Sequence, residues 1–170
     1  MTNPRRPFRL NVGFLINQPV GYSHEFLFDF PKIQIADDLD LSQFNGVINI
    51  GHTPQGLLIQ GDFTAQIKME CVRCLNSFEQ HLHWKMTELY AFSARSVSES
   101  GLIMPEDAHI DLQPLIREYA LLEAPISPIC KTDCRGLCPV CGENLNRADC
   151  GHRPQSEASQ FSILKDLLKE

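Results

Sequence analysis

Seven cysteines, five of them within residues 130–150, constrain this 170-residue chain more than any other feature. They fall into short-range groups: Cys71 with Cys74, Cys130 with Cys134, Cys138 with Cys141, and Cys150 with His152. Thiolates repel one another, so a turn that gathers them needs a cation and backbone N–H donors. The run CPVCG at 138–142 is typical of such a turn around tetrahedral zinc. The sequence therefore predicts one or two Zn²⁺ ions.

The sequence predicts a reduced, cytoplasmic protein rather than one held by disulfides. The first twenty residues contain arginines but no long apolar core and no small-residue cleavage site, so no secretory signal is expected. No run of eighteen apolar residues exists, so no membrane-spanning helix is expected. A reducing cytosol and an odd number of cysteines both argue against a disulfide framework.

Seven cysteines and one histidine can fill two four-coordinate sites, and two divisions of the donors are open. In the first, Cys71, Cys74, Cys130 and Cys134 form one site, and Cys138, Cys141, Cys150 and His152 form a second, local site. In the other, Cys130, Cys134, Cys138 and Cys141 form a single local site and the pair at 71 and 74 stays free. We favour the first because it leaves no thiol exposed. Alternatively, Cys71 binds no metal and acts as a small apolar side chain buried in the core.

Period-two alternation over residues 61–71 and 77–92 predicts two half-buried strands. One face of the first carries Phe63, Ala65, Ile67, Met69 and Cys71, and one face of the second carries Phe78, Leu82, Trp84, Met86, Tyr90 and Phe92. The short run CVRCLN between them predicts an antiparallel hairpin. Residues 8–16, 25–30 and 44–53 are further strand candidates, with a turn at 53–56. We expect an α+β fold built on an antiparallel meander, either a twisted sheet or a partly closed barrel.

After a polar loop at 93–108, the spacing of apolar residues becomes helical. We expect a helix over 111–124, with Asp111 as N-cap, Pro114 in the first turn and Pro125 after its end. The resulting division is a β core over 1–125, a cysteine-rich, zinc-ribbon-like segment over 126–155, and a short amphipathic helix over 156–170, all in a single domain.

Two enzymatic interpretations of the cysteines are disfavoured. The run CRGLCPVC has the spacing of the iron–sulfur motif of radical S-adenosylmethionine enzymes, but the alternating βα pattern of their barrel is missing. A redox Cys-x-x-Cys usually opens a helix, whereas Cys71 and Cys74 lie in a predicted hairpin. No phosphate loop, paired carboxylates or nucleophile elbow is found. We expect a protein that is not an enzyme and takes no small-molecule substrate.

The formal charge of −6 is uneven along the chain. Residues 11–125 carry six Lys and Arg against fifteen Asp and Glu, whereas residues 126–155 carry four against three. An acidic body repels phosphate at long range, so any RNA contact should be local. A protein partner fits the charge at least as well.

Three stretches resemble the YceD family, the large ribosomal RNA subunit accumulation proteins. They are GDFTAQIKMECVRCLNSF at 61–78, CKTDCRGLCPVCGENLN at 130–146 and SQFSILKDLLKE at 159–170. The resemblance implies a small non-enzymatic factor that supports accumulation or processing of large-subunit ribosomal RNA, or ribosome assembly. Its expected partners are ribosomal RNA or a ribosomal or assembly protein. The alternatives are a metal-held protein-interaction module without an RNA role, and an iron–sulfur or thiol redox protein.

Four arginines lie within or beside the cysteine turns, where a bound metal would fix their positions. They are Arg73, Arg135, Arg147 and Arg153. We predict that they contact phosphate or a partner; the alternative is that they are solvated surface charges. Asn144 and Asn146 in the run GENLN are predicted to form turns rather than to read bases.

Overall fold

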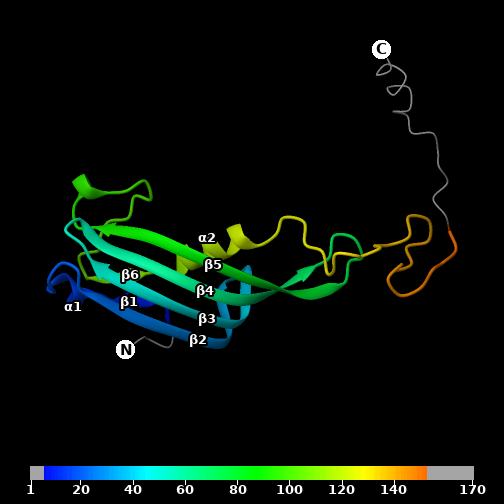
Figure 1. Ribbon diagram of the computed structural model, residues 1–170, viewed down its shortest axis with the longest axis horizontal. Coiled ribbons are helices and arrows are strands. Elements are labelled where there is room, and N and C mark those ends of the chain that lie inside the picture. Colours follow the sequence, from blue (N-terminus) through cyan, green and yellow to red (C-terminus); the bar gives the residue numbers. More distant parts are fainter. Residues whose placement is uncertain (1–5, 153–170) are drawn as a thin grey trace, which may run out of the picture. The chain divides into compact units, whose positions relative to one another are not determined.

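The structure is a computed structural model that describes residues 6–152 (Figure 1). Within them the chain forms two compact units. The first, here called the β unit, comprises residues 6–69 and 78–126; the second, the cysteine unit, comprises residues 70–77 and 127–152. The tip of the predicted hairpin thus groups with the cysteine-rich segment. The helix predicted over 156–170 lies outside the described residues.

The predicted antiparallel meander is confirmed. Four long strands make one sheet: β2 (Ser23–Ala36), β3 (Leu39–His52), β4 (Gly56–Glu70) and β5 (Ser77–Ala91). Figure 1 shows them side by side in the order β2, β3, β4, β5. Over the described residues β2 and β5 each pair with only one strand of this sheet, so the sheet is open. The predicted turn at 53–56 is present, closed by a hydrogen bond from Thr53 N to Gly56 O of 2.9 Å.

The remaining elements are shorter. They are β1 (Arg9–Asn11), α1 (Gly13–Ile16), η1 (Ala94–Ser96), β6 (His109–Asp111) and α2 (Gln113–Glu123). β1 and β6 pair antiparallel as a separate two-stranded sheet. The strand predicted over 8–16 was wrong in its second half, where the chain forms α1. The apolar residues of this short stretch fit either structure, since a few positions do not separate the two periods.

Helix α2 follows the strands as predicted but begins two residues later, at Gln113. Asp111 ends β6, and Leu112 occupies the N-cap position. The Asp111 carboxylate still accepts a hydrogen bond from the Gln113 N–H, at 3.0 Å, so it satisfies a free donor of the first turn. Ile116 and Ala120 are the buried residues of this helix.

Aromatic side chains form the centre of the core of the β unit. The Phe63 ring stacks on Trp84 with centroids 5.5 Å apart and packs on Phe44 at 5.6 Å. Its position depends on two neighbouring glycines. A Cβ atom on Gly46 would lie 2.1 Å from the Phe63 ring, and one on Gly61 would lie 2.4 Å from it. The two glycines therefore leave the space that the ring fills.

The burial pattern follows the predicted faces of both long strands. Phe63 and Ala65 in β4, and Leu82, Trp84 and Met86 in β5, are at most 4% exposed. The polar positions between them are exposed or half-buried, except Gln66, which is 7% exposed.

Candidate metal centres

The first candidate centre starts in the turn between β4 and β5. The Cys71 N–H donates to the Asn76 carbonyl at 2.9 Å, and the Leu75 N–H donates to the Cys71 carbonyl at 2.9 Å. Leu75 has a positive φ of 59°, which tightens the turn. This arrangement directs both thiols of the turn, Cys71 and Cys74, inward, where each is at most 3% exposed.

Backbone hydrogen bonds hold the second cysteine segment against this turn. The Val72 N–H donates to the Pro128 carbonyl at 3.0 Å, and the Leu137 N–H donates to the Arg73 carbonyl at 3.1 Å. Gly136 approaches the turn so closely that a Cβ atom there would lie 3.0 Å from the Arg73 carbonyl oxygen. Residues 130 and 134 are thereby placed opposite the two thiols of the turn.

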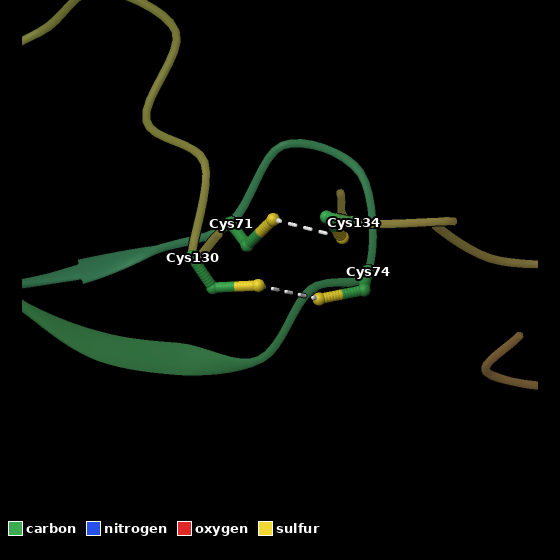
Figure 2. A group of neighbouring side chains, drawn as sticks. All are labelled: Cys71, Cys74, Cys130 and Cys134. Atoms are coloured by element: carbon green, nitrogen blue, oxygen red, sulfur yellow. Dashed lines mark hydrogen bonds between the residues drawn. The ribbon is translucent and has the colours of Figure 1, made fainter. Parts of the chain in front are cut away.

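The four sulfurs meet as Figure 2 shows. The Sγ atoms of Cys71 and Cys134 are 3.8 Å apart, and those of Cys74 and Cys130 are 3.6 Å apart. All four lie within 4.8 Å of one another. A tetrahedral ion with metal–sulfur bonds of about 2.3 Å places sulfurs about 3.8 Å apart, whereas a disulfide requires about 2.05 Å. The arrangement fits a four-thiolate metal site, and no disulfide is formed.

Burial, hydrogen bonds and neighbouring thiols shift the pKa values of these cysteines in opposite directions. Burial opposes ionisation of Cys71, but backbone N–H donors of Cys130, Cys74 and Arg73 outweigh it and lower its pKa to about 6. Burial and the neighbouring thiols raise the pKa of Cys130 to about 12. The pKa of Cys74 is raised as well, because burial and the Cys71 thiol outweigh its hydrogen bond to the Asn76 backbone. One thiolate suppresses ionisation of the others, and a cation removes that repulsion.

Two side chains outside the ligand set contact this cluster. Asn146 donates from Nδ2 to the Cys134 sulfur at 3.4 Å, and Arg73 donates to the Cys134 carbonyl at 3.1 Å. Burial opposes the Cys134 thiolate, while the Asn146 amide and the Gly136 backbone lower its pKa overall. Such outer contacts orient ligands and stabilise their charge.

The second candidate centre lies farther along the same unit and is more open. Cys138, Cys141, Cys150 and His152 bring their donor atoms within 4.8 Å of one another. The turn of CPVCG closes through hydrogen bonds from Gly142 N to the Cys138 carbonyl at 2.9 Å and from Cys138 N to the Glu143 carbonyl at 2.8 Å. Gly142 has a φ of 74°, which favours glycine at this position.

Burial and pKa shifts differ between the members of the second centre. Cys138 is 3% exposed, whereas Cys141 and His152 are exposed. Backbone N–H donors of Cys141 and Val140 lower the pKa of Cys138 to about 6. The pKa of Cys150 is raised, because the Cys138 thiolate and burial outweigh its hydrogen bond to the His152 backbone. Three thiols and an imidazole are a donor set that zinc accepts.

The structure thus groups the eight donors in the first of the two predicted ways, and these are the two groups found among the described residues. Metal binding itself stays a prediction. Of the four predicted contact arginines, Arg73, Arg135 and Arg147 are exposed, and Arg153 lies outside the described residues. Arg73 also donates to the Cys134 carbonyl.

Asn144 and Asn146 form a turn, as predicted: the Asn144 carboxamide oxygen accepts the Asn146 N–H at 3.0 Å. The contact of Asn146 with a ligand sulfur was not predicted. No spacing rule signals it, because the two residues are twelve positions apart in a loop.

Comparison with known proteins places this sequence in a family. The sequence profile described as large ribosomal RNA subunit accumulation protein YceD matches residues 59–168, which include both candidate metal centres. The chain belongs to the YceD family. This confirms the resemblance carried by the strand–cysteine–strand and cysteine-rich stretches.

Individual relatives of this YceD-family chain are similar over part of their length. An uncharacterized protein of Mycobacterium tuberculosis is 32% identical over 137 residues, which are 77% of this chain and 61% of that protein. The Large ribosomal RNA subunit accumulation protein YCED homolog 1, chloroplastic, of Arabidopsis thaliana is 40% identical over 66 residues, 39% of this chain and 21% of that protein. The chain spans less than two thirds of the length of these relatives. No solved structure matches it.

Within the described residues, no helix has the length and apolar character needed to cross a bilayer.

Proposed function

We propose that the protein is a non-enzymatic, cytoplasmic factor for accumulation or assembly of the large ribosomal subunit, with zinc in both cysteine clusters. The match of residues 59–168 to the YceD family carries this proposal. The relative from Arabidopsis thaliana bears large ribosomal RNA subunit accumulation in its name. Zinc is the metal we assign because tetrahedral thiolate sites without an open position are typical of structural zinc.

Zinc would give the cysteine unit a fixed surface. When bound, it neutralises the mutual repulsion of the thiolates and holds their turns in place. Arg135 and Arg147 are exposed on these turns and are our candidates for contact with phosphate. Val72, Leu75 and Val140, which are 54–67% exposed, supply apolar contact area in the same unit. A partner that combines RNA and protein fits this mixture.

The metal assignment is tested by elemental analysis and thiol titration of the purified full chain. We expect two zinc ions per chain and no thiol that reacts before a denaturant or chelator is added. One zinc with two or more reactive thiols would support the rival division of the ligands. A metal-free, folded protein with seven reactive thiols would refute zinc altogether.

The ribosomal role is tested by depletion of the protein in the cells that encode it. We expect the ratio of large- to small-subunit ribosomal RNA to fall and to recover with the wild-type chain. The double variant Arg135→Glu, Arg147→Glu should fail to restore it. The double variant Lys32→Glu, Lys68→Glu, which reverses two charges at exposed positions of β2 and β4, is the matched control and should restore it. An unchanged ratio after depletion would refute the role.

A second candidate is a metal-held module that binds protein without RNA, which the acidic charge favours. Fifteen carboxylates against six basic residues over 11–125 repel RNA and suit a basic protein surface. Affinity purification with and without nuclease separates the two. Partners lost after nuclease treatment indicate RNA mediation, and partners retained support the protein module.

A further inference from the structure

The loop of residues 142–149 contacts both candidate metal centres. Residues 142–149 are bounded on both sides by ligands of the second centre, Cys141 and Cys150. Yet the middle of this loop reaches the first centre, where the Asn146 Nδ2 atom lies 3.4 Å from the Cys134 sulfur. The ends of the loop thus belong to one centre and its midpoint contacts the other.

The Asn146 carboxamide is held by contacts that fix its orientation. Its Oδ1 accepts the Arg135 N–H at 2.9 Å, one residue from the ligand Cys134. Its Nδ2 donates to Asn144 Oδ1 at 2.9 Å in addition to the sulfur. The amide therefore points N–H at the sulfur, the polarity that stabilises a thiolate. A rotated amide would place an acceptor against it.

The backbone of the loop pairs with the segment that joins the two ligand sets. The Leu145 N–H donates to the Gly136 carbonyl at 3.0 Å, and Leu137 and Asn144 form an isolated antiparallel bridge. Asn144 also donates to the Asn76 side chain, in the turn of the first centre, at 3.5 Å. Asn146 therefore reaches the Cys134 sulfur only when the loop keeps this conformation.

We propose that Asn146 is a positioning residue that couples metal binding at the two centres. This inference rests on the proposed zinc sites. A metal held by Cys141 and Cys150 restricts both ends of the loop and keeps the Asn146 amide at the Cys134 sulfur. Binding at the second centre then raises affinity at the first, and by linkage the reverse holds equally. The loop acts as the shared element that both metals order.

The test is a double-mutant cycle on the full chain, with Co²⁺ and Zn²⁺ as probes. The variants are Asn146→Ala, Cys150→Ser and their combination. Affinity of the four-cysteine centre is read from cobalt absorption and zinc competition, since a four-thiolate and a three-thiolate–imidazole site absorb differently. Ala148→Ser, at an exposed position of the same loop, is the control and should change neither affinity.

We expect Asn146→Ala to weaken the four-cysteine centre about 10- to 100-fold. Cys150→Ser should weaken the same centre about fivefold or more. The double variant should be no weaker than Asn146→Ala within about twofold, because the coupling route is already gone. Factors that multiply in the double variant, or an unchanged first centre in Cys150→Ser, would overturn the proposal.

Asn146→Asp guards against loss of folding in the alanine variant, since it keeps the acceptor for the Arg135 N–H and removes the donor to sulfur. We expect it to weaken the first centre and to shift the cobalt–thiolate charge-transfer band. An unshifted band would mean that the amide does not act on the sulfur. If the wild-type chain binds two metals independently, the coupling by Asn146 is refuted and the zinc sites are not. If the chain binds no metal, both the coupling and the zinc sites are refuted.

Discussion

The two units of this protein bury different kinds of atoms. In the β unit the fully buried side chains are large and apolar, among them Phe8, Phe44 and Phe63. In the cysteine unit the buried side chains of the described residues are four cysteines and Pro128, while Val72, Leu75 and Val140 are more than half exposed. The first unit is folded around an apolar core, and the second around sulfur.

Because of this difference, we expect the two units to be stabilised by different interactions. Burial of apolar area stabilises the β unit at about 25 cal/mol per Å² and needs no ligand. The cysteine unit gains little from that term, and its buried thiols repel one another once ionised. We infer that metal–sulfur bonds supply most of its stability, so the two units should respond to different perturbations.

Removal of the metal should produce the largest effect, confined to the cysteine unit. Structural zinc contributes about 10–16 kcal/mol to the folding of small domains. We expect a chelator to abolish amide-exchange protection over residues 70–77 and 127–152 while strands β2 and β3 stay protected. Hydrogen-exchange mass spectrometry resolves the two segments. Equal loss of protection in β3 would show that the two units do not fold separately.

Removal of an aromatic side chain from the core should destabilise the β unit and leave the cysteine unit intact. We expect Phe63→Ala to destabilise the β unit by about 3–5 kcal/mol, because it removes the stacked ring and leaves a cavity beside Trp84. The denaturant midpoint measures the loss, and the zinc content should not change. Val140→Ala, at an exposed position of the cysteine unit, is the control and should alter stability by no more than about 0.5 kcal/mol. Zinc loss from the Phe63 variant would contradict the separation.

The sequence predicted the β unit well because strand alternation records burial directly. The faces of residues 61–71 and 77–92 could be assigned from the alternation of apolar and polar side chains. Burial follows them except at Gln66, which is buried, and at Phe92, which is 37% exposed and lies beyond β5. The start of α2 was predicted two residues too early. Asp111 ends strand β6, and from there its carboxylate accepts the N–H of Gln113, the first residue of the helix. An N-cap residue type thus marked the helix start to within two positions.

Prediction was weaker in the cysteine unit for a physical reason. Spacing along the chain identifies ligands but not which turns meet, so two divisions of the cysteines stayed open. Hydrogen bonds such as Val72 to Pro128, between residues 56 apart in sequence, decide between them. No local pattern encodes these contacts, and the same holds for the contact of Asn146 with Cys134.

A smaller difference between the two units is expected in their pH dependence, because metal binding in the cysteine unit releases protons. At pH 7 the pKa of about 6 leaves Cys71 ionised, whereas Cys130, with a pKa of about 12, and Cys74, with a raised pKa, hold their protons. Metal binding at this centre must displace at least those two protons. Affinity therefore rises with pH, by about 100-fold per unit or about 2.7 kcal/mol, and is lost as the pH falls. Calorimetry in buffers of different ionisation enthalpy counts the protons.

The β unit should not show this pH dependence near neutral pH. Hydrogen bonds lower the pKa of its carboxylates Asp38, Asp62 and Asp107 from 3.8. Groups with a lowered pKa contribute stability above their usual value and lose it on acidification below about 4. These three carboxylates therefore contribute no pH dependence between pH 6 and 8, where the metal affinity should change with pH. Release of fewer than two protons would contradict the pKa shifts of the cluster.

The smallest effect expected is the loss of one hydrogen bond that joins helix α2 to strand β5. The Tyr119 hydroxyl donates to Glu88 Oε1 at 2.8 Å, and both side chains are half-buried. We expect Tyr119→Phe to lower the urea midpoint by the equivalent of about 0.5–1.5 kcal/mol, because the Glu88 carboxylate loses a donor that water replaces only in part.

Tyr22→Phe, an exposed tyrosine of the same unit, is the matched control and should shift the midpoint by no more than about 0.5 kcal/mol. Zinc content should stay constant in both variants, since neither touches the cysteine unit. Equal midpoints for the two variants would show that this hydrogen bond adds nothing to the stability of the packed helix, which the buried Ile116 and Ala120 and the Arg117–Asp38 ion pair would then account for.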